Sequence, residues 1–213
     1  MMKYRATPWL VVSHYVRKSL KKRYSQAESK EIMNNARKAY KNLLGRAEDI
    51  GYRSPMSSNL YMVLAFFSFH AGNRSLIKKD EMKKIIDEFY EDRLIRRYLG
   101  MINLNKPWHF NAFRRGIHRH AEWIEKRRDV YPGNWDFDFN THHVDGLSYR
   151  FTICPIAQFF HDNGFDGYTP LFCAMDYKNV ELAHGNLYRK HTIAEGSGEC
   201  DFWIVPDGIT DPK

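Results

Sequence analysis

The 213-residue sequence is poor in cysteine: it has only three, all of them in the last third of the chain. Small secreted domains that depend on disulfides usually carry a larger, even number. The sequence also opens without a charged and then apolar leader segment. We therefore expect a reduced, cytoplasmic protein with no intramolecular disulfide.

Long hydrophobic runs and glycine-rich phosphate loops are missing as well. The longest apolar run covers residues 60–69 and is interrupted by Ser68, whereas a membrane-spanning helix needs roughly 20 apolar residues. We find no glycine-rich loop after an expected strand and no internal repeat. These absences argue against a membrane-spanning protein and against a phosphate-loop nucleotide enzyme.

Acidic residues are scarce in the first part of the chain and basic residues in the second. Residues 1–132 carry 28 Lys+Arg and 13 Asp+Glu, whereas residues 133–213 carry 5 and 12. The formal net charge of +8 therefore overstates the case for a polyanionic partner, because the two parts can attract each other. No helix-turn-helix, zinc-finger or RNA-stacking motif is present, so we do not expect a nucleic-acid partner. Any such binding should be weak and lost in ordinary salt.

The first part has the periodicity of α-helices. Hydrophobic residues make up 43% of the chain, enough to form the core of one large or two small domains. Ser25 and Glu28 form a capping-box pattern ahead of apolar residues at helical spacing. Residues 57–70 are apolar on nearly every face, as in a helix buried within a bundle. The expected helices cover residues 8–24, 25–44, 57–70, 79–99 and 112–130.

The pattern changes at Gly133, where apolar and polar residues begin to alternate with a period of two. This alternation predicts strands at 135–139, 147–153, 187–194 and 200–205, with short helices at 156–162 and 171–184. The fold class is therefore predicted as α+β: a helical part, 1–132, packed on a small antiparallel sheet in 133–213. The two parts could form separate domains or one compact domain.

The three cysteines are the first candidates for chemistry. Cys154 lies at the start of an expected helix, where free N–H groups and the helix dipole favour a thiolate. Cys173 and Asp176 are three residues apart and share one helix face. Cys200 opens the last strand, with Asp201 on its opposite face. Such groups could provide a nucleophile, activate water or bind a soft metal; alternatively, each cysteine is a small buried hydrophobic residue.

The spacing of the cysteines gives little support to a metal site. There is no C-x-x-C motif, and no histidine pair at i, i+4 accompanies the cysteines. We therefore predict no metal ligands and no cofactor, although further histidines in this part could contribute to a metal site. They are His142, His143, His161, His184 and His191.

Residues 154–202 resemble the L-2-amino-thiazoline-4-carboxylic acid hydrolase family. The resemblance rests on a cysteine before a short helix, a P-x-x-C-x-x-D motif, an R-x-x-T-[LI]-A-x-G motif and a final C-D-F. These elements are Cys154; Pro170, Cys173 and Asp176; Arg189, Thr192, Ile193, Ala194 and Gly196; and Cys200, Asp201 and Phe202. Ser197 departs from the pattern, where a second glycine is common. The match covers about a quarter of the chain.

The resemblance implies a hydrolase that opens a small cyclic amidine or thiazoline-type carboxylic acid. Such a reaction needs a nucleophile or activated water, an acid and a cation for the substrate carboxylate. By resemblance, Cys173 acts as nucleophile and Asp176 as base or orienting group, with Cys154 and Cys200 completing the catalytic set. Substrate binding is implied for Arg189, Thr192 and Asp201.

Several alternatives remain open at this point. Arg189 could instead form a structural ion pair with Asp176 or Asp201, Thr192 could be a strand residue, and Gly196 could serve a turn with unusual backbone angles. A non-catalytic sensor that binds a small molecule or metal is the alternative function. A homo-oligomer is compatible with the sequence, which does not specify the oligomeric state.

Overall fold

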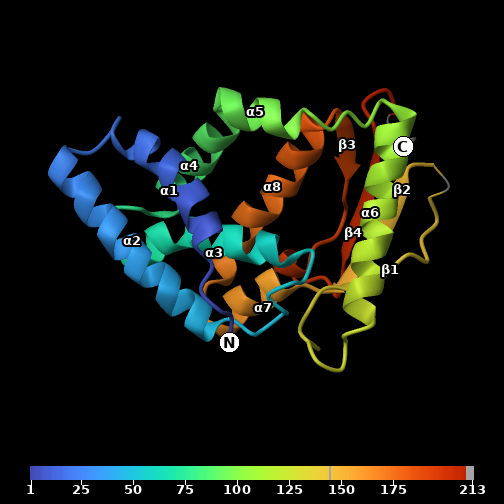
Figure 1. Cartoon of the computed structure of the whole chain (residues 1–213), viewed down its shortest axis with the longest axis horizontal. Helices are drawn as coiled ribbons and strands as arrows, with labels where there is room; N and C mark the ends of the chain where they lie inside the picture. The colour runs from blue at the N-terminus through green and yellow to red at the C-terminus, as the bar shows by residue number, and fades with distance from the viewer. Residues whose placement is uncertain (144, 210–213) are drawn as a thin grey trace. The chain divides into compact units, whose positions relative to one another are not determined.

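The structure is a computed structural model that describes residues 1–143 and 145–209. By its internal contacts the chain divides into two compact units, Met1–Asp92 and Arg93–Lys213. Figure 1 shows helices alone in the first unit, and helices together with a sheet in the second. The change of periodicity at Gly133 thus falls inside the second unit, and the division into domains 1–132 and 133–213 stays a prediction.

The first unit consists of four helices, of which α3 is buried among the other three. They are α1 (Ala6–Leu20), α2 (Gln26–Arg46), α3 (Ser57–Gly72) and α4 (Lys79–Glu91). The indole of Trp9 in α1 stacks on Phe69 of α3 and on Tyr40 of α2, with ring centroids 5.6 and 5.7 Å apart. A Cβ on Gly72 would lie 2.7 Å from the backbone of Asn35, so glycine permits the close approach of α3 to α2.

The second unit combines helices with a four-stranded antiparallel sheet. Its helices are α5 (Arg93–Leu99), α6 (Pro107–Glu125), α7 (Pro155–Asp162) and α8 (Thr169–Leu182), with short 3₁₀ turns η1 (Asp166–Tyr168) and η2 (Ile193–Glu195). Its strands are β1 (Asp136–Asp138), β2 (Leu147–Ile153), β3 (Gly185–Tyr188) and β4 (Cys200–Pro206). The strand order is β1-β2-β4-β3. The predicted α+β class is confirmed.

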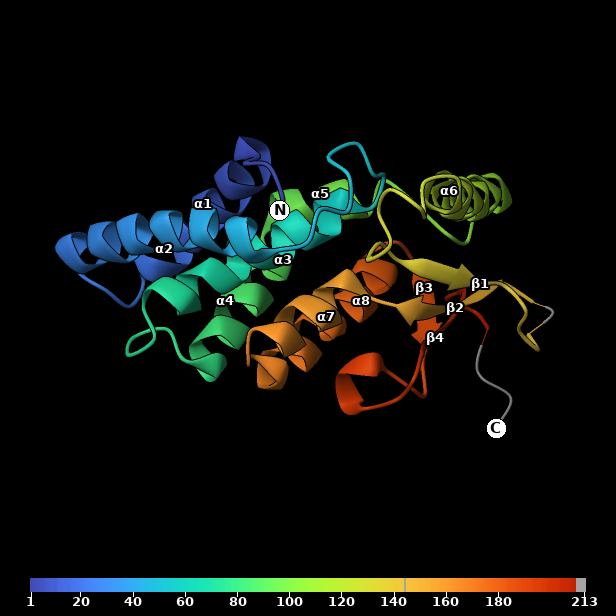
Figure 2. The same cartoon turned by 90° about the horizontal axis from the view of Figure 1, so that it is seen from below.

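The central strand β4 fixes the two faces of the sheet. It pairs with β2 on one side, where Phe202 lies opposite Tyr149, and with β3 on the other. Because side chains alternate along a strand, Cys200 and Phe202 point to one face and Asp201 and Trp203 to the other. Helix α8 packs against β3 and α6 lies beside β1 (Figures 1 and 2).

Most expected helices and strands are present, with shifted ends. The capping box of Ser25 and Glu28 forms as predicted, and α3 is buried around its circumference. The helix expected to stop at Gly45 continues to Arg46, since glycine weakens a helix without ending it. The helix predicted over 112–130 is α6, which starts earlier because Pro107 fits a first helical turn.

Two expected elements are wrong in their extent. The helix predicted over 79–99 is broken into α4 and α5, because Asp92 adopts extended angles (φ −61°, ψ 129°). The strand predicted over 187–194 ends at Tyr188. Its continuation is lost because the N–H groups of Lys190 and His191 donate to the carboxylate of Asp201 instead of to a strand.

No described helix combines the length and the hydropathy that a membrane crossing requires.

Candidate active site

A buried arginine joins the two residues of the P-x-x-C-x-x-D motif. Cys173 and Asp176 lie on successive turns of α8, and Arg189 follows the end of β3. Its Nη1 donates to Oδ2 of Asp176 at 2.9 Å, and its Nη2 donates to the backbone carbonyl of Cys173 at 2.9 Å. One guanidinium therefore ties the loop after β3 to the helix that carries the thiol and the carboxylate.

The guanidinium of Arg189 is buried, with hydrogen-bond acceptors and two aromatic rings around it. Its side chain is 3% exposed, and its central carbon lies 4.9 Å from the ring centroid of Tyr177 and 5.0 Å from that of Phe202. Only Nε lacks a hydrogen-bond partner among the described residues. Through its Nη1, Arg189 positions the carboxylate of Asp176. The ion pair with Asp176, one of the alternatives for Arg189, is present.

Asp176 is accessible although it bonds to a buried partner. Its side chain is 43% exposed. Burial raises the pKa of this carboxyl above its usual value, and the charge and hydrogen bond of Arg189 oppose that rise. A carboxylate whose pKa is raised is a stronger base than an ordinary aspartate. Asp176 is therefore oriented, reachable and suited to accept a proton.

The other two cysteines lie within electrostatic reach of the same carboxylate. Cys154 is the residue before α7, and Cys200 begins β4, where its Sγ accepts the N–H of Ile193 at 3.2 Å. The negative charge of Asp176 helps to raise the pKa of Cys154, Cys173 and Cys200. Arg189 thus bonds to Cys173 and Asp176, and the charge of Asp176 acts on Cys154 and Cys200; we call these five residues the thiol–carboxylate cluster.

The thiols are protonated at neutral pH. Burial raises the pKa of Cys154 to about 12, more than the N–H groups of Ala157 and Ile156 lower it. The expected thiolate at this helix start is therefore wrong, because desolvation outweighs the helix N-terminus. Burial also raises the pKa values of Cys173 and Cys200. All three cysteines are free thiols.

Tyr149 is a neighbour of the cluster that the sequence analysis missed. It is 5% exposed, and its ring stacks on Phe202 with centroids 5.0 Å apart and planes 8° apart. Burial, followed by the charge of Asp176, raises its pKa, whereas Arg189 lowers it. The alternation in β2 shows which face Tyr149 occupies, but only the register of β2 on β4 reveals its place beside the cluster.

Two predicted substrate-binding residues make hydrogen bonds with the loop after β3. The carboxylate of Asp201 is on the opposite face of the sheet, where it accepts the N–H groups of Lys190 and His191. Thr192 is buried and donates its hydroxyl to Glu195 at 2.8 Å, so it closes the η2 turn. Gly196 ends that turn with φ +88°, which confirms the predicted need for an unusual backbone angle.

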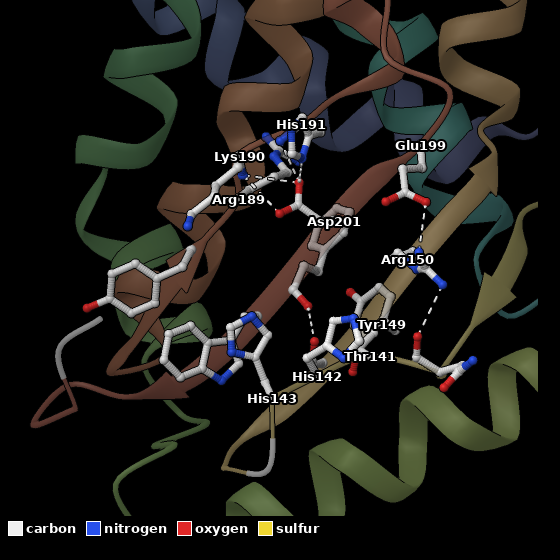
Figure 3. Close-up of a pocket in the computed structure, with 15 residues that line it drawn as sticks. Thr141, His142, His143, Tyr149, Arg150, Arg189, Lys190, His191, Glu199 and Asp201 are labelled. Carbon is white, nitrogen blue, oxygen red and sulfur yellow. Dashed lines mark hydrogen bonds and ion pairs between the residues drawn. The ribbon is translucent and has the colours of Figure 1, made fainter. Parts of the chain in front are cut away.

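The opposite face of the sheet carries a cavity of about 280 Å³ (Figure 3). Arg150 and Glu199 form an ion pair at 3.2 Å on one side of it, and the imidazole of His143 stacks on Trp203 with ring centroids 4.1 Å apart. Asp201 lines this cavity, and so do Arg189 of the thiol–carboxylate cluster and its neighbours Tyr149 and Phe202. Arg150 and Glu199 thus pair within the cavity, whereas Arg189 pairs with Asp176 outside its lining.

Potential metal ligands are dispersed in the described ranges 1–143 and 145–209. No three or more of their His, Cys, Asp and Glu side chains are arranged so that they could hold a metal ion.

Comparison with known proteins gives one match. The family model described as L-2-amino-thiazoline-4-carboxylic acid hydrolase matches residues 57–204, which include the whole thiol–carboxylate cluster. No curated protein and no solved structure matches the chain significantly.

Proposed function

Because the chain belongs to the L-2-amino-thiazoline-4-carboxylic acid hydrolase family, we propose that it opens a small cyclic amidine or thiazoline-type carboxylic acid at the thiol–carboxylate cluster. The observation that carries this proposal is the accessible carboxylate of Asp176, oriented by the buried Arg189 beside Cys173. A hydrolase needs such an oriented base next to its reacting group.

In this proposal Asp176 accepts the proton of the attacking group. Either a water or the Sγ of Cys173 adds to the ring carbon that bears the exocyclic amine, while its proton passes to Asp176. The bond from that carbon to a ring nitrogen or sulfur then breaks, and the proton moves from Asp176 to the departing heteroatom. In the thiol route a water must next release the Cys173 adduct. Arg189 holds Asp176 in place throughout.

The raised pKa values of the thiols favour the water route over a preformed thiolate. A protonated thiol is a poor nucleophile, so Cys173 would need Asp176 to remove its proton during attack. The same observation supports a second candidate function, a non-catalytic module that binds a small carboxylic acid beside the cluster and acts as a sensor. The two functions differ in one measurable respect, which is turnover.

The test is turnover of L-2-amino-thiazoline-4-carboxylic acid by the purified protein. We expect Asp176→Asn to lower kcat/KM about 100-fold or more, the usual range for loss of a general base, with an unchanged circular dichroism spectrum. Asp201→Asn is the matched control, because its carboxylate faces the other side of the sheet, and it should keep most of the activity.

Cys173→Ser separates the two chemical routes. A serine hydroxyl is far less nucleophilic, so the thiol route predicts near-complete loss of turnover and a covalent adduct on the unchanged protein by mass spectrometry. The water route predicts a modest loss and no adduct. Calorimetric binding of the acid without turnover would favour the sensor, and full activity of Asp176→Asn would contradict the assigned site.

A further inference from the structure

The segment from Arg93 to Ala121 has an unusual charge pattern. It contains no Asp or Glu, and its basic residues are six arginines and one lysine. In residues 1–92, by contrast, lysines outnumber arginines 11 to 7. Arginine is enriched in protein–protein interfaces whereas Lys, Asp and Glu are depleted there. The segment therefore has the charge composition of an interface.

The same segment carries five of the large apolar side chains that the described chain leaves exposed. They are Leu94 (60% exposed), Tyr98 (71%), Met101 (69%), Ile102 (48%) and Trp108 (67%). Leu94, Tyr98 and Met101 follow helical spacing and lie on one side of α5 and of the turn after it, whereas Ile95 is buried. Exposed apolar residues gathered in this way mark an interaction site.

The exposed residues belong to an ordered surface. The N–H of Asn103 donates to Nδ1 of His109 at 2.8 Å, so the turn with Met101 and Ile102 is tied to the first turn of α6, which carries Trp108. The next residue, Leu104, is buried, and its N–H donates to the backbone carbonyl of Ala183, just after α8, at 2.8 Å. Figure 1 shows α5 leading into α6 through this connection. The side chains are thus presented on a fixed backbone.

We propose that this surface, residues 94–108, binds a second copy of the chain. The complementary charge lies in the same protein: residues 133–213 carry 12 Asp+Glu and 5 Lys+Arg. Asp145 and Asp162, for example, are exposed and form no ion pair with a Lys or Arg within the described residues. Exposed Leu94, Met101 and Ile102 offer little to a nucleic acid, whereas they fill the centre of a protein interface.

The proposal does not depend on the proposed hydrolase, and its test is the mass of the protein in solution. Sedimentation velocity with light scattering should show a dimer or a larger closed assembly at roughly micromolar concentration. Trp108→Ala with Tyr98→Ser should weaken association at least tenfold, because exposed aromatic residues are typical interface hot spots. Arg97→Glu should also weaken association, and so should a higher salt concentration.

Val130→Ser is the matched control, since Val130 is 67% exposed but lies outside the surface; its association should match the unchanged protein. Hydrogen exchange at low and high concentration gives a second measurement, in which residues 94–108 should become protected. A protein that stays monomeric at roughly 100 μM, or one whose association ignores these substitutions, would overturn the proposal. A monomer that instead binds DNA or phosphatidylglycerol vesicles through this surface would overturn it too.

Discussion

The two units of the chain bury different kinds of side chain. Met1–Asp92 contains no cysteine, and its fully buried large residues are aromatic and aliphatic, among them Phe66, Phe67 and Tyr61. Arg93–Lys213 contains all three thiols and buries Arg189 beside a carboxylate. Burial of apolar groups stabilises a fold, whereas burial of ionisable groups opposes folding and shifts pKa values. The comparison locates structural stability in the first unit and reactive groups in the second.

The two units also differ in net charge. Residues 1–92 carry 18 Lys+Arg and 10 Asp+Glu, whereas residues 93–213 carry 15 of each. The net charge of +8 therefore belongs entirely to the first unit. The second unit is neutral overall but divided: residues 93–132 carry 10 Lys+Arg and 3 Asp+Glu, whereas residues 133–213 carry 5 and 12. We therefore expect substitutions and pH changes to act differently on the two units.

The largest effect is expected from the core of the first unit. Phe66 is fully buried in α3 and contacts Phe89 edge to face at 5.2 Å. Phe66→Ala should lower the free energy of unfolding by about 3–5 kcal/mol, because it removes apolar contacts and leaves a cavity. Chemical denaturation measures the loss, and kcat of the folded fraction should be unchanged. A loss below about 1 kcal/mol would contradict the assigned core.

Arg189→Met probes the buried ion pair of the second unit. It should lower the free energy of unfolding by about 1–3 kcal/mol, less than for a fully buried pair because Asp176 is partly solvated. The guanidinium lowers the pKa of Asp176, so its loss should move the acid limb of the kcat/KM profile to higher pH. Arg150→Met, on the opposite face, is the control. An acid limb that moves to lower pH would contradict this assignment.

Alkaline pH should distinguish the two units. Folding raises the pKa of Cys154 from 9.0 to about 12, so the folded state retains a proton that the unfolded state loses. Stability from this thiol is complete below about pH 8.5 and declines as pH rises toward 12, by about 1–1.5 kcal/mol at pH 10. Urea unfolding at pH 7.5 and 10 measures the decline, and Cys154→Ala should reduce it. An unchanged decline in that variant would contradict the buried thiol.

The smallest effect is expected at the capping box of α2. The Ser25 hydroxyl accepts the N–H of Glu28 at 3.3 Å, and the Glu28 carboxylate accepts the N–H of Ser25 at 2.9 Å. Ser25→Ala should cost about 0.5–1 kcal/mol of unfolding free energy. Thermal unfolding measures the cost, with Ser197→Ala, in the loop before β4, as the control. Turnover should not change, and a change would show that the units do not separate stability from reactivity.

Local patterns were sufficient to predict much of the fold. The capping box of α2, the buried α3 and the strand over 147–153 all follow from periodicity and turn residues. The break at Asp92 and the early end of β3 could not be read in this way. The break depends on the backbone angles of Asp92 alone. The early end of β3 depends on the distant carboxylate of Asp201, which accepts the N–H groups of Lys190 and His191.

The membership of the candidate site stays a prediction, whereas the environment of its residues can be compared with the structure. Family-like spacing selected Cys154, Cys173, Asp176, Arg189 and Cys200. The protonated state of Cys154 was missed because burial depends on tertiary packing, whereas a helix start is visible in the sequence. Tyr149 was missed because its neighbours lie on β4 and α8, and strand register is a long-range property.

The alternation of β4 gives an engineer two separate sets of positions. The side chains at positions 200 and 202 point to the face of the thiol–carboxylate cluster, and those at positions 201 and 203 point to the other face. A library that randomises only the odd positions would explore new ligands while the reactive groups stay constant. Since β4 is paired along both edges, a single-residue deletion in it would exchange the two sets, and we expect such deletions to be absent from any functional library.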